Sequence, residues 1–131
     1  MISTGPFLAA AFLAQITATP ADRSVSADSA RTLAAVPEFN RLFEEQLIDA
    51  ESARFRDVNL HDGGLRLCGL VNARNRFGGY VGWRKFSAFH FAPYTLLEIE
   101  DPSKPYIVVD CRERTSDVDY SSVFSGTVHK D

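Results

Sequence analysis

The chain has 131 residues, 45% of them hydrophobic and 24% charged, and its formal net charge is −3. This length corresponds to one domain, and ten Phe residues supply enough apolar surface for a core, which excludes a chain that is disordered throughout. The net charge is too small to imply a polyanionic or membrane-surface partner. Its distribution is uneven, because the balance is −4 over residues 22–53, +5 over 54–85 and −4 over 86–131.

Residues 1–21 carry no charged side chain and have the features of a signal peptide. The apolar run from Gly5 to Ala14 is too short to span a bilayer and has the length of a signal-peptide core. Cleavage after Ala18 or Ala21 fits the small residues that follow it. The basic residues that usually precede such a core are missing, and a buried N-terminal helix is the alternative. We predict a signal peptide over 1–21, and hence a periplasmic or secreted protein.

The chain contains two cysteines, Cys68 and Cys111. In an exported domain two cysteines indicate one disulfide, whereas in the cytosol they would be buried thiols. The bridge would close a loop of 44 residues and contribute roughly 3–4 kcal/mol by restricting the unfolded chain. In the strand expected around Cys68, this residue shares a face with Arg66 and Asn72. We therefore expect the bridge outside the main core, and more exposed than a core disulfide.

Residues 22–37 are small and polar, and they predict a linker or a short helix. The strongest helix signal follows at Glu38–Asp49, where four large apolar residues recur at i, i+3, i+4 and i+8 and form one apolar stripe. These residues are Phe39, Leu42, Phe43 and Leu47. Such a helix must bury its stripe, and the surface available is the sheet that we expect after it.

Five strands joined by tight turns are predicted after this helix. They cover Phe55–Leu60, Leu65–Asn72, Tyr80–Phe91, Leu96–Glu100 and Tyr106–Cys111. The turn at 61–64 contains Asp-Gly and Gly-Gly, which adopt positive φ at little cost. Successive strands with short turns predict an α+β domain over 38–112, an amphipathic helix packed on an antiparallel meander of about five strands. Residues 113–131 are Ser-rich and predict a polar, loosely docked C-terminal tail.

The most unusual local composition lies at residues 72–80, where basic and aromatic side chains are interspersed with Asn and Gly, and further basic and aromatic residues follow at 83–85. In a binding site, the basic groups would contact phosphate or another anion and the aromatic rings would stack on bases. The alternative is a hairpin loop in which Asn and Gly serve the turn geometry and Arg serves solubility. The candidate binding residues are Arg74, Arg76, Phe77, Tyr80, Trp83 and Arg84.

No catalytic set or cofactor motif stands out in the sequence. His61 and Asp62 lie near Cys68, but turn geometry accounts for the first two and a disulfide accounts for the cysteine. The three histidines are scattered without the paired spacing that metal sites use. We therefore expect no catalytic residue, no metal and no cofactor.

Three motifs follow one another between Asp49 and Phe86. They are D-A-E-S-A-R-F-R-D-V from Asp49, C-G-L-V-N-A-R-N from Cys68 and F-G-G-Y-V-G from Phe77. In this order they resemble a family of small uncharacterised bacterial and prophage proteins that often carry a signal or lipoprotein leader. This chain has Ala50 where the family pattern has Pro, and Arg74 where it has Lys. The resemblance implies export and a disulfide to a second cysteine near the C-terminus, and it implies no activity.

These features together predict a small exported protein that acts by binding, without catalysis and with another protein as its partner. After removal of the leader, no membrane segment is expected. The alternative is a cytoplasmic bacterial or phage protein that binds nucleic acid or nucleoprotein through the basic segment 54–85. An enzyme is the least supported class.

Overall fold

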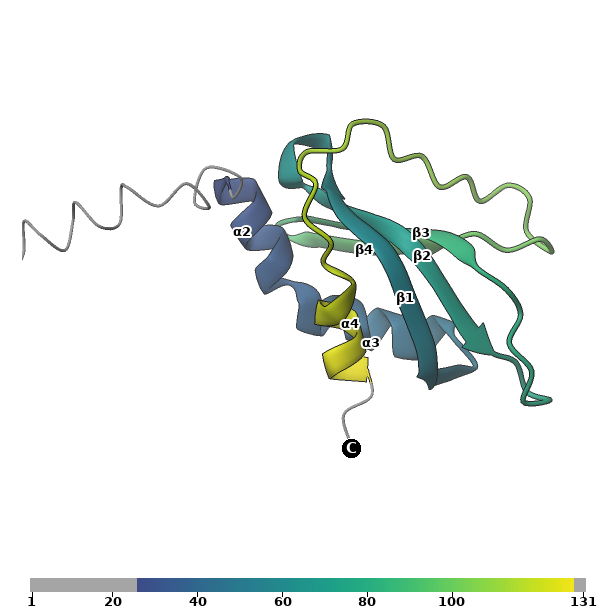
Figure 1. The fold of residues 1–131 in the computed structure, drawn as a ribbon. Helices are drawn as coiled ribbons and strands as arrows, with labels where there is room; N and C mark the ends of the chain where they lie inside the picture. Colours follow the sequence, from purple (N-terminus) through teal and green to yellow (C-terminus); the bar gives the residue numbers. More distant parts are fainter. Residues whose placement is uncertain (1–25, 129–131) are drawn as a thin grey trace, which may run out of the picture.

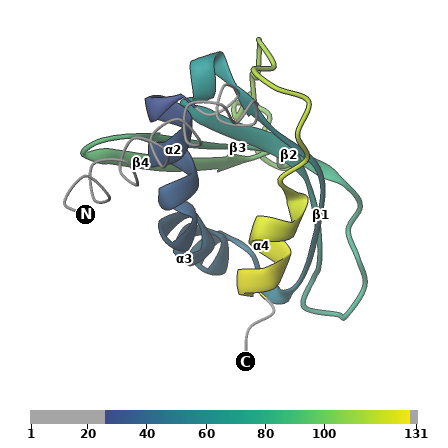
Figure 2. The same ribbon diagram turned by 60° about the vertical axis from the view of Figure 1, so that its left-hand side comes forward.

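The computed structural model describes residues 26–128 and has an α+β fold (Figure 1). Its elements are α2 (Ala27–Ala34), α3 (Val36–Gln46), β1 (Asp49–His61), the 3-10 turn η2 (Asp62–Gly64), β2 (Arg66–Arg74), β3 (Arg84–Phe91), β4 (Tyr94–Ile99) and α4 (Ser121–Val128). The four strands form one antiparallel sheet in the order β1-β2-β3-β4, an open meander. The three helices lie on one face of this sheet, as Figures 1 and 2 both show. The leader predicted at residues 1–21 lies outside the described residues.

The segment predicted as a linker or short helix forms helix α2. Its N-cap is Ser26, whose side-chain oxygen accepts a hydrogen bond from the Ser29 backbone N–H at 3.1 Å. Ala35 separates α2 from α3, and Pro37 lies in the first turn of α3, where its missing N–H needs no partner. The helix expected at Glu38–Asp49 is α3, which begins two residues earlier at Val36 and ends at Gln46, because the chain turns at residues 47–48 into β1.

Two strands differ in length from their prediction. Strand β1 begins at Asp49, six residues before the strand expected from Phe55, and the Ser52 hydroxyl bridges an irregular part of its ladder by accepting a hydrogen bond from the Arg74 N–H at 2.9 Å. Strand β3 begins at Arg84 and not at Tyr80, because Gly82 has a φ of 104° and interrupts the extended backbone. The tight turn after His61 is formed as predicted, with positive φ at each residue of η2.

The fifth strand expected at Tyr106–Cys111 is not formed. This segment belongs to the strap, the name we give to residues 100–120, which crosses the sheet on the side opposite the helices before it reaches α4 (Figures 1 and 2). Pro102 and Pro105 remove backbone donors near the start of the strap. The β-forming residues that follow lie over the face of the sheet and not beside a strand edge, so no ladder forms.

A β-bulge interrupts β1 opposite Gly69. The register passes from Arg56↔Leu70 to Asn59↔Cys68, so that Asp57 and Val58 together oppose this one glycine. Asp57 takes up the extra residue with a φ of 55°. A Cβ atom on Gly69 would meet a Val58 methyl group at 2.7 Å, so the close approach at the bulge needs glycine.

The core lies between the helices and the sheet and contains a cluster of fully or almost fully buried Phe rings. The Phe43 ring of α3 has its centroid 5.1 Å from that of Phe55, 5.2 Å from that of Phe86 and 5.4 Å from that of Phe124. The Phe39 side chain of the same helix is also fully buried.

The polar tail predicted at 113–131 therefore contributes to the core, because it includes α4 and the fully buried Phe124. The composition of this segment is polar, but Phe124 packs among three other rings, and Tyr120 and Val123 pack against the same core.

Candidate functional site

The predicted binding residues lie around the connection between β2 and β3. Asn75 organises this connection, because its side-chain oxygen accepts hydrogen bonds from the N–H groups of Phe77 at 2.9 Å and Gly79 at 3.2 Å. The Asn72 side chain accepts a further hydrogen bond from the Gly82 N–H at 2.9 Å. The expected use of Asn and Gly in turn geometry is thus realised at these positions.

Two aromatic side chains of the connection stack against arginines of the neighbouring strands. The Arg54 guanidinium carbon lies 4.4 Å from the centroid of the Tyr80 ring, and that of Arg74 lies 6.0 Å from the same centroid. The Arg56 guanidinium carbon lies 4.3 Å from the Trp83 ring. We call these five residues the guanidinium–aromatic face.

Strand β1 aligns two of these arginines. Arg54 and Arg56 flank the buried Phe55, so both project from the sheet face opposite the helices, about 7 Å apart. A guanidinium that stacks flat on a ring keeps its N–H donors in the plane of the group, where they can bind a carboxylate or phosphate.

Ion pairs engage part of this face. Arg74 Nε lies 3.3 Å from a carboxylate oxygen of Asp49, and Arg56 Nε lies 3.9 Å from Asp57. Within residues 26–128, Arg54 has no carboxylate oxygen within 4.0 Å. All three arginines are exposed to solvent, and an exposed pair of this kind contributes little to stability.

The structure brings together three of the six predicted residues and separates the others. Arg74, Tyr80 and Trp83 belong to the guanidinium–aromatic face, whereas Arg76 and Phe77 project at the tip of the connection, with 88% of Phe77 exposed. Arg84 begins β3 and has no ring contact within the guanidinium–aromatic face; it lines a groove that adjoins this face.

Sequence reasoning did not single out Arg54 and Arg56, although both lie in the basic segment. Their alternation about Phe55 was the available signal, but the rings that they contact are more than twenty residues away in the chain.

The stacking geometry bears on whether the aromatic residues bind nucleic-acid bases or belong to a structural loop. A platform for nucleic-acid bases needs ring faces that are open to the ligand. Here guanidinium groups lie over the rings of Tyr80 and Trp83, and the Tyr80 hydroxyl donates a hydrogen bond to the Ser52 carbonyl at 3.0 Å. Among the predicted aromatic residues, Phe77 alone is left largely exposed.

The strap is fastened to the sheet at its C-terminal half. The N–H of Thr115 donates to the Leu60 carbonyl at 2.7 Å, and the N–H of Tyr120 donates to the Val58 carbonyl at 2.7 Å. The Asn59 side chain donates to the Val118 carbonyl at 2.8 Å. These bonds hold residues 113–120 along the outer edge of β1.

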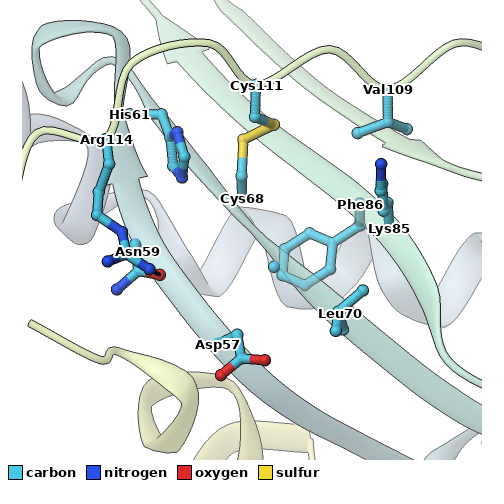
Figure 3. Close-up of a pocket in the computed structure, with 11 residues that line it drawn as sticks. Asp57, Asn59, His61, Cys68, Leu70, Lys85, Phe86, Val109, Cys111 and Arg114 are labelled. Carbon is cyan, nitrogen blue, oxygen red and sulfur yellow. Dashed lines mark hydrogen bonds between the residues drawn. A yellow bond between two sulfur atoms is a disulfide. The ribbon is translucent and has the colours of Figure 1, made fainter. Parts of the chain in front are cut away.

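Cys68 and Cys111 form a disulfide that joins β2 to the strap, with Cα atoms 6.4 Å apart. This distance lies within the range that a disulfide requires. The bridge lies outside the helix-side core, on the face that the alternation in β2 predicted (Figure 3). The expected exposure is wrong for Cys68, of which only 4% is exposed, because the strap covers it.

A cleft of about 330 Å³ lies between the strap and the sheet around this disulfide (Figure 3). His61 lies beside it with a buried Nδ1 that has no hydrogen-bond partner among the described residues. Burial lowers the pKa of His61 below its usual 6.5; Asp62 opposes this shift, and Arg114 and Arg66 add to it. The nearest cysteine, Cys68, is engaged in the disulfide, so it offers no free thiol for His61 to activate.

A second, larger groove of about 600 Å³ lies between the start of β3 and the first part of the strap. Its lining residues are Val81, Trp83, Arg84, Lys85, Glu100, Asp101, Pro102, Pro105, Ile107, Val108 and Val109. This groove is continuous with the guanidinium–aromatic face, because Trp83 belongs to both.

Within the described part of the chain, no group of three or more His, Cys, Asp or Glu side chains is arranged to hold a metal ion. None of the helices at 26–128 is both long enough and apolar enough to cross a bilayer. Comparison with models of protein families, with curated proteins and with solved structures finds no match to this chain. The family resemblance of Asp49–Phe86 thus stays a prediction from the motifs.

Proposed function

We propose that this chain is a small exported protein that binds another protein, without catalysis, through the guanidinium–aromatic face. The observation that carries the proposal is the set of three exposed arginines held on one sheet face by two aromatic rings. The rings hold the guanidinium groups in place before a ligand arrives, so binding costs less side-chain entropy than it would for free arginines. The partner is an acidic surface or segment.

Export is supported by two independent features. The uncharged N-terminal segment has the composition of a signal peptide, and a disulfide between Cys68 and Cys111 is compatible with an oxidising compartment. Fractionation of cells that express the full chain tests this part of the proposal. We expect the processed protein outside the cytoplasm, and an uncleaved cytoplasmic chain would contradict export.

The binding itself is tested with labelled poly-L-glutamate as the acidic probe, measured by fluorescence anisotropy at low and at physiological ionic strength. The double variant Arg54→Gln/Arg56→Gln should bind about tenfold more weakly, because two charge-assisted contacts are lost. Arg41→Gln is the matched control, since Arg41 is an equally exposed arginine that pairs with Glu38 and Glu45 on α3. Equal losses for the double variant and the control would refute the assignment of the site.

Nucleic-acid binding through the basic segment is the second candidate function. The observation in its favour is the tip of the connection, where Arg76 and the almost fully exposed Phe77 offer one cation and one open ring face. Single-stranded oligothymidylate is the probe for this alternative. Binding that is tighter than that of poly-L-glutamate, and that weakens in Arg76→Ala and Phe77→Ala, would favour nucleic acid over an acidic protein.

A further inference from the structure

The groove beside Trp83 offers apolar surface next to the guanidinium–aromatic face. Trp83 is 37% exposed, Val81 is 42% exposed and Val108 on the opposite side of the groove is 71% exposed. Pro105 also lines the groove, and it adds a rigid apolar surface. The groove volume of about 600 Å³ exceeds that of any one side chain, so a large apolar side chain can enter it.

The groove carries two acidic and two basic side chains. Its acidic residues are engaged within the fold: Glu100 accepts a hydrogen bond from the Lys85 N–H at 3.4 Å, and Asp101 accepts hydrogen bonds from the N–H and the hydroxyl of Ser103 at 2.9 and 2.8 Å. Its basic side chains, Arg84 and Lys85, have no ion pair with a described residue. The charge of Arg84 nevertheless helps to lower the pKa of Asp101, after the hydrogen bonds from Ser103, so the two cations and two carboxylates of the groove balance one another. The positive charge left for a partner is that of the guanidinium–aromatic face, where Arg54 has no carboxylate of a described residue within 4.0 Å.

We propose that this groove binds one apolar side chain of an extended acidic peptide whose neighbouring carboxylates contact the guanidinium–aromatic face. This inference rests on the proposed function and adds the chemistry of the partner segment. Alternate side chains of an extended peptide are about 7 Å apart, which matches the separation of Arg54 and Arg56 along β1. A chain with two acidic residues and one aromatic residue at alternate positions presents all three side chains to the same surface and fits both of its parts.

The disulfide positions one side of the groove. Among the described residues, the hydrogen bonds and ion pairs of segment 101–112 lie within the segment, and the bond from Cys111 to Cys68 is its covalent cross-link to the sheet. The residues on either side are held by backbone hydrogen bonds, from the Glu100 N–H to the Lys85 carbonyl and from the Asp62 N–H to the Glu113 carbonyl. Val109, two residues before Cys111, lines the cleft around the disulfide (Figure 3), and it also lines this groove. Reduction of the bridge should therefore release the strap side of the groove while β1 and its arginines remain in place.

Two synthetic peptides test the inference on the full-length protein: acetyl-Glu-Ser-Glu-Ser-Phe-Ser-amide, whose two Glu and one Phe side chains lie on one face of the extended chain, and the same peptide with Ala in place of Phe. We expect the Phe peptide to bind about tenfold more tightly, because it removes aromatic surface from water. The emission of Trp83 should change with the Phe peptide only, and Trp83 is the single tryptophan of the chain. Dithiol reduction should abolish the preference for Phe and leave the weaker binding of the Ala peptide unchanged.

Val108→Ser removes apolar surface from the groove and should lose most of the preference for Phe. The matched control is Tyr106→Ser, which removes an exposed aromatic side chain of the same strap that does not line the groove. Equal binding of the two peptides to the native protein would overturn the inference, and so would an equal effect of the two substitutions. The proposed function is tested separately, by the double variant Arg54→Gln/Arg56→Gln. Dimerisation that buries Trp83 without any peptide would assign the groove to a second copy and overturn the inference as well.

Discussion

Substitution of Phe43 by Ala tests the packing of α3 against the sheet. Phe43 is fully buried, and its ring makes edge-to-face contacts with the rings of Phe55 on β1, Phe86 on β3 and Phe124 on α4. Removal of a buried aromatic ring costs the transfer free energy of its atoms and leaves a cavity, together roughly 3–5 kcal/mol. Because Phe43 joins a helix, two strands and the C-terminal helix, we expect a value near the upper end of this range.

The free energy of unfolding is measured by urea denaturation, followed by far-UV circular dichroism with the disulfide intact. A loss of 3–5 kcal/mol is a large share of the roughly 5–15 kcal/mol that stabilises a domain, and it should lower Tm by roughly 10–20 °C. Phe77→Ala is the control, since a ring that is 88% exposed should contribute within about 0.5 kcal/mol. A loss below about 1 kcal/mol for Phe43→Ala would mean that α3 does not hold the core together.

Two further predictions concern the sheet and the strap. Gly69→Ala should lower the free energy of unfolding by about 1–3 kcal/mol in the same urea assay, because the new methyl group meets Val58 across the bulge. Gly79→Ala, with open space around it, is the control, and equal stability of the two variants would contradict the close approach. Protein recovered from an oxidising compartment should contain no free thiol after unfolding without reductant, and reduction should cost roughly 3–4 kcal/mol. Two reactive thiols in that protein would show that Cys68 and Cys111 do not pair during export.

Local sequence patterns predicted much of the α+β architecture. The apolar period at 38–47 predicted a helix, and the Asp-Gly-Gly turn predicted the first hairpin, because both signals depend on residues that are neighbours in the chain. Four of the five expected strands are present, with boundaries shifted at 49–54 and 80–83. The β1 boundary shifts where the Ser52 hydroxyl binds the Arg74 N–H of the partner strand, and the β3 boundary shifts where Gly82 interrupts the extended backbone. Local sequence patterns do not reveal either feature.

The pairing of the cysteines was also accessible from the sequence, since a chain with two of them has one possible intramolecular bridge. The burial of Cys68 in this disulfide could not be predicted from the sequence. The exposure of Cys68 depends on a strap that returns over the sheet, and the polar composition of residues 113–131 gives no indication that Phe124 completes the core.

The sequence alone established the class of the fold, the single cysteine pair and the basic, aromatic character of the segment around residues 72–85. The three-dimensional packing decided that Ile107–Val109 lie over the sheet and not in it, since a strand forms only where another strand edge offers its backbone groups. It also decided that Arg54 and Arg56 of β1 complete the candidate site. Each of these arginines contacts a ring more than twenty residues away in the chain. Such a contact depends on the register of the sheet and on the course of the β2–β3 connection, and short-range sequence patterns encode neither of them.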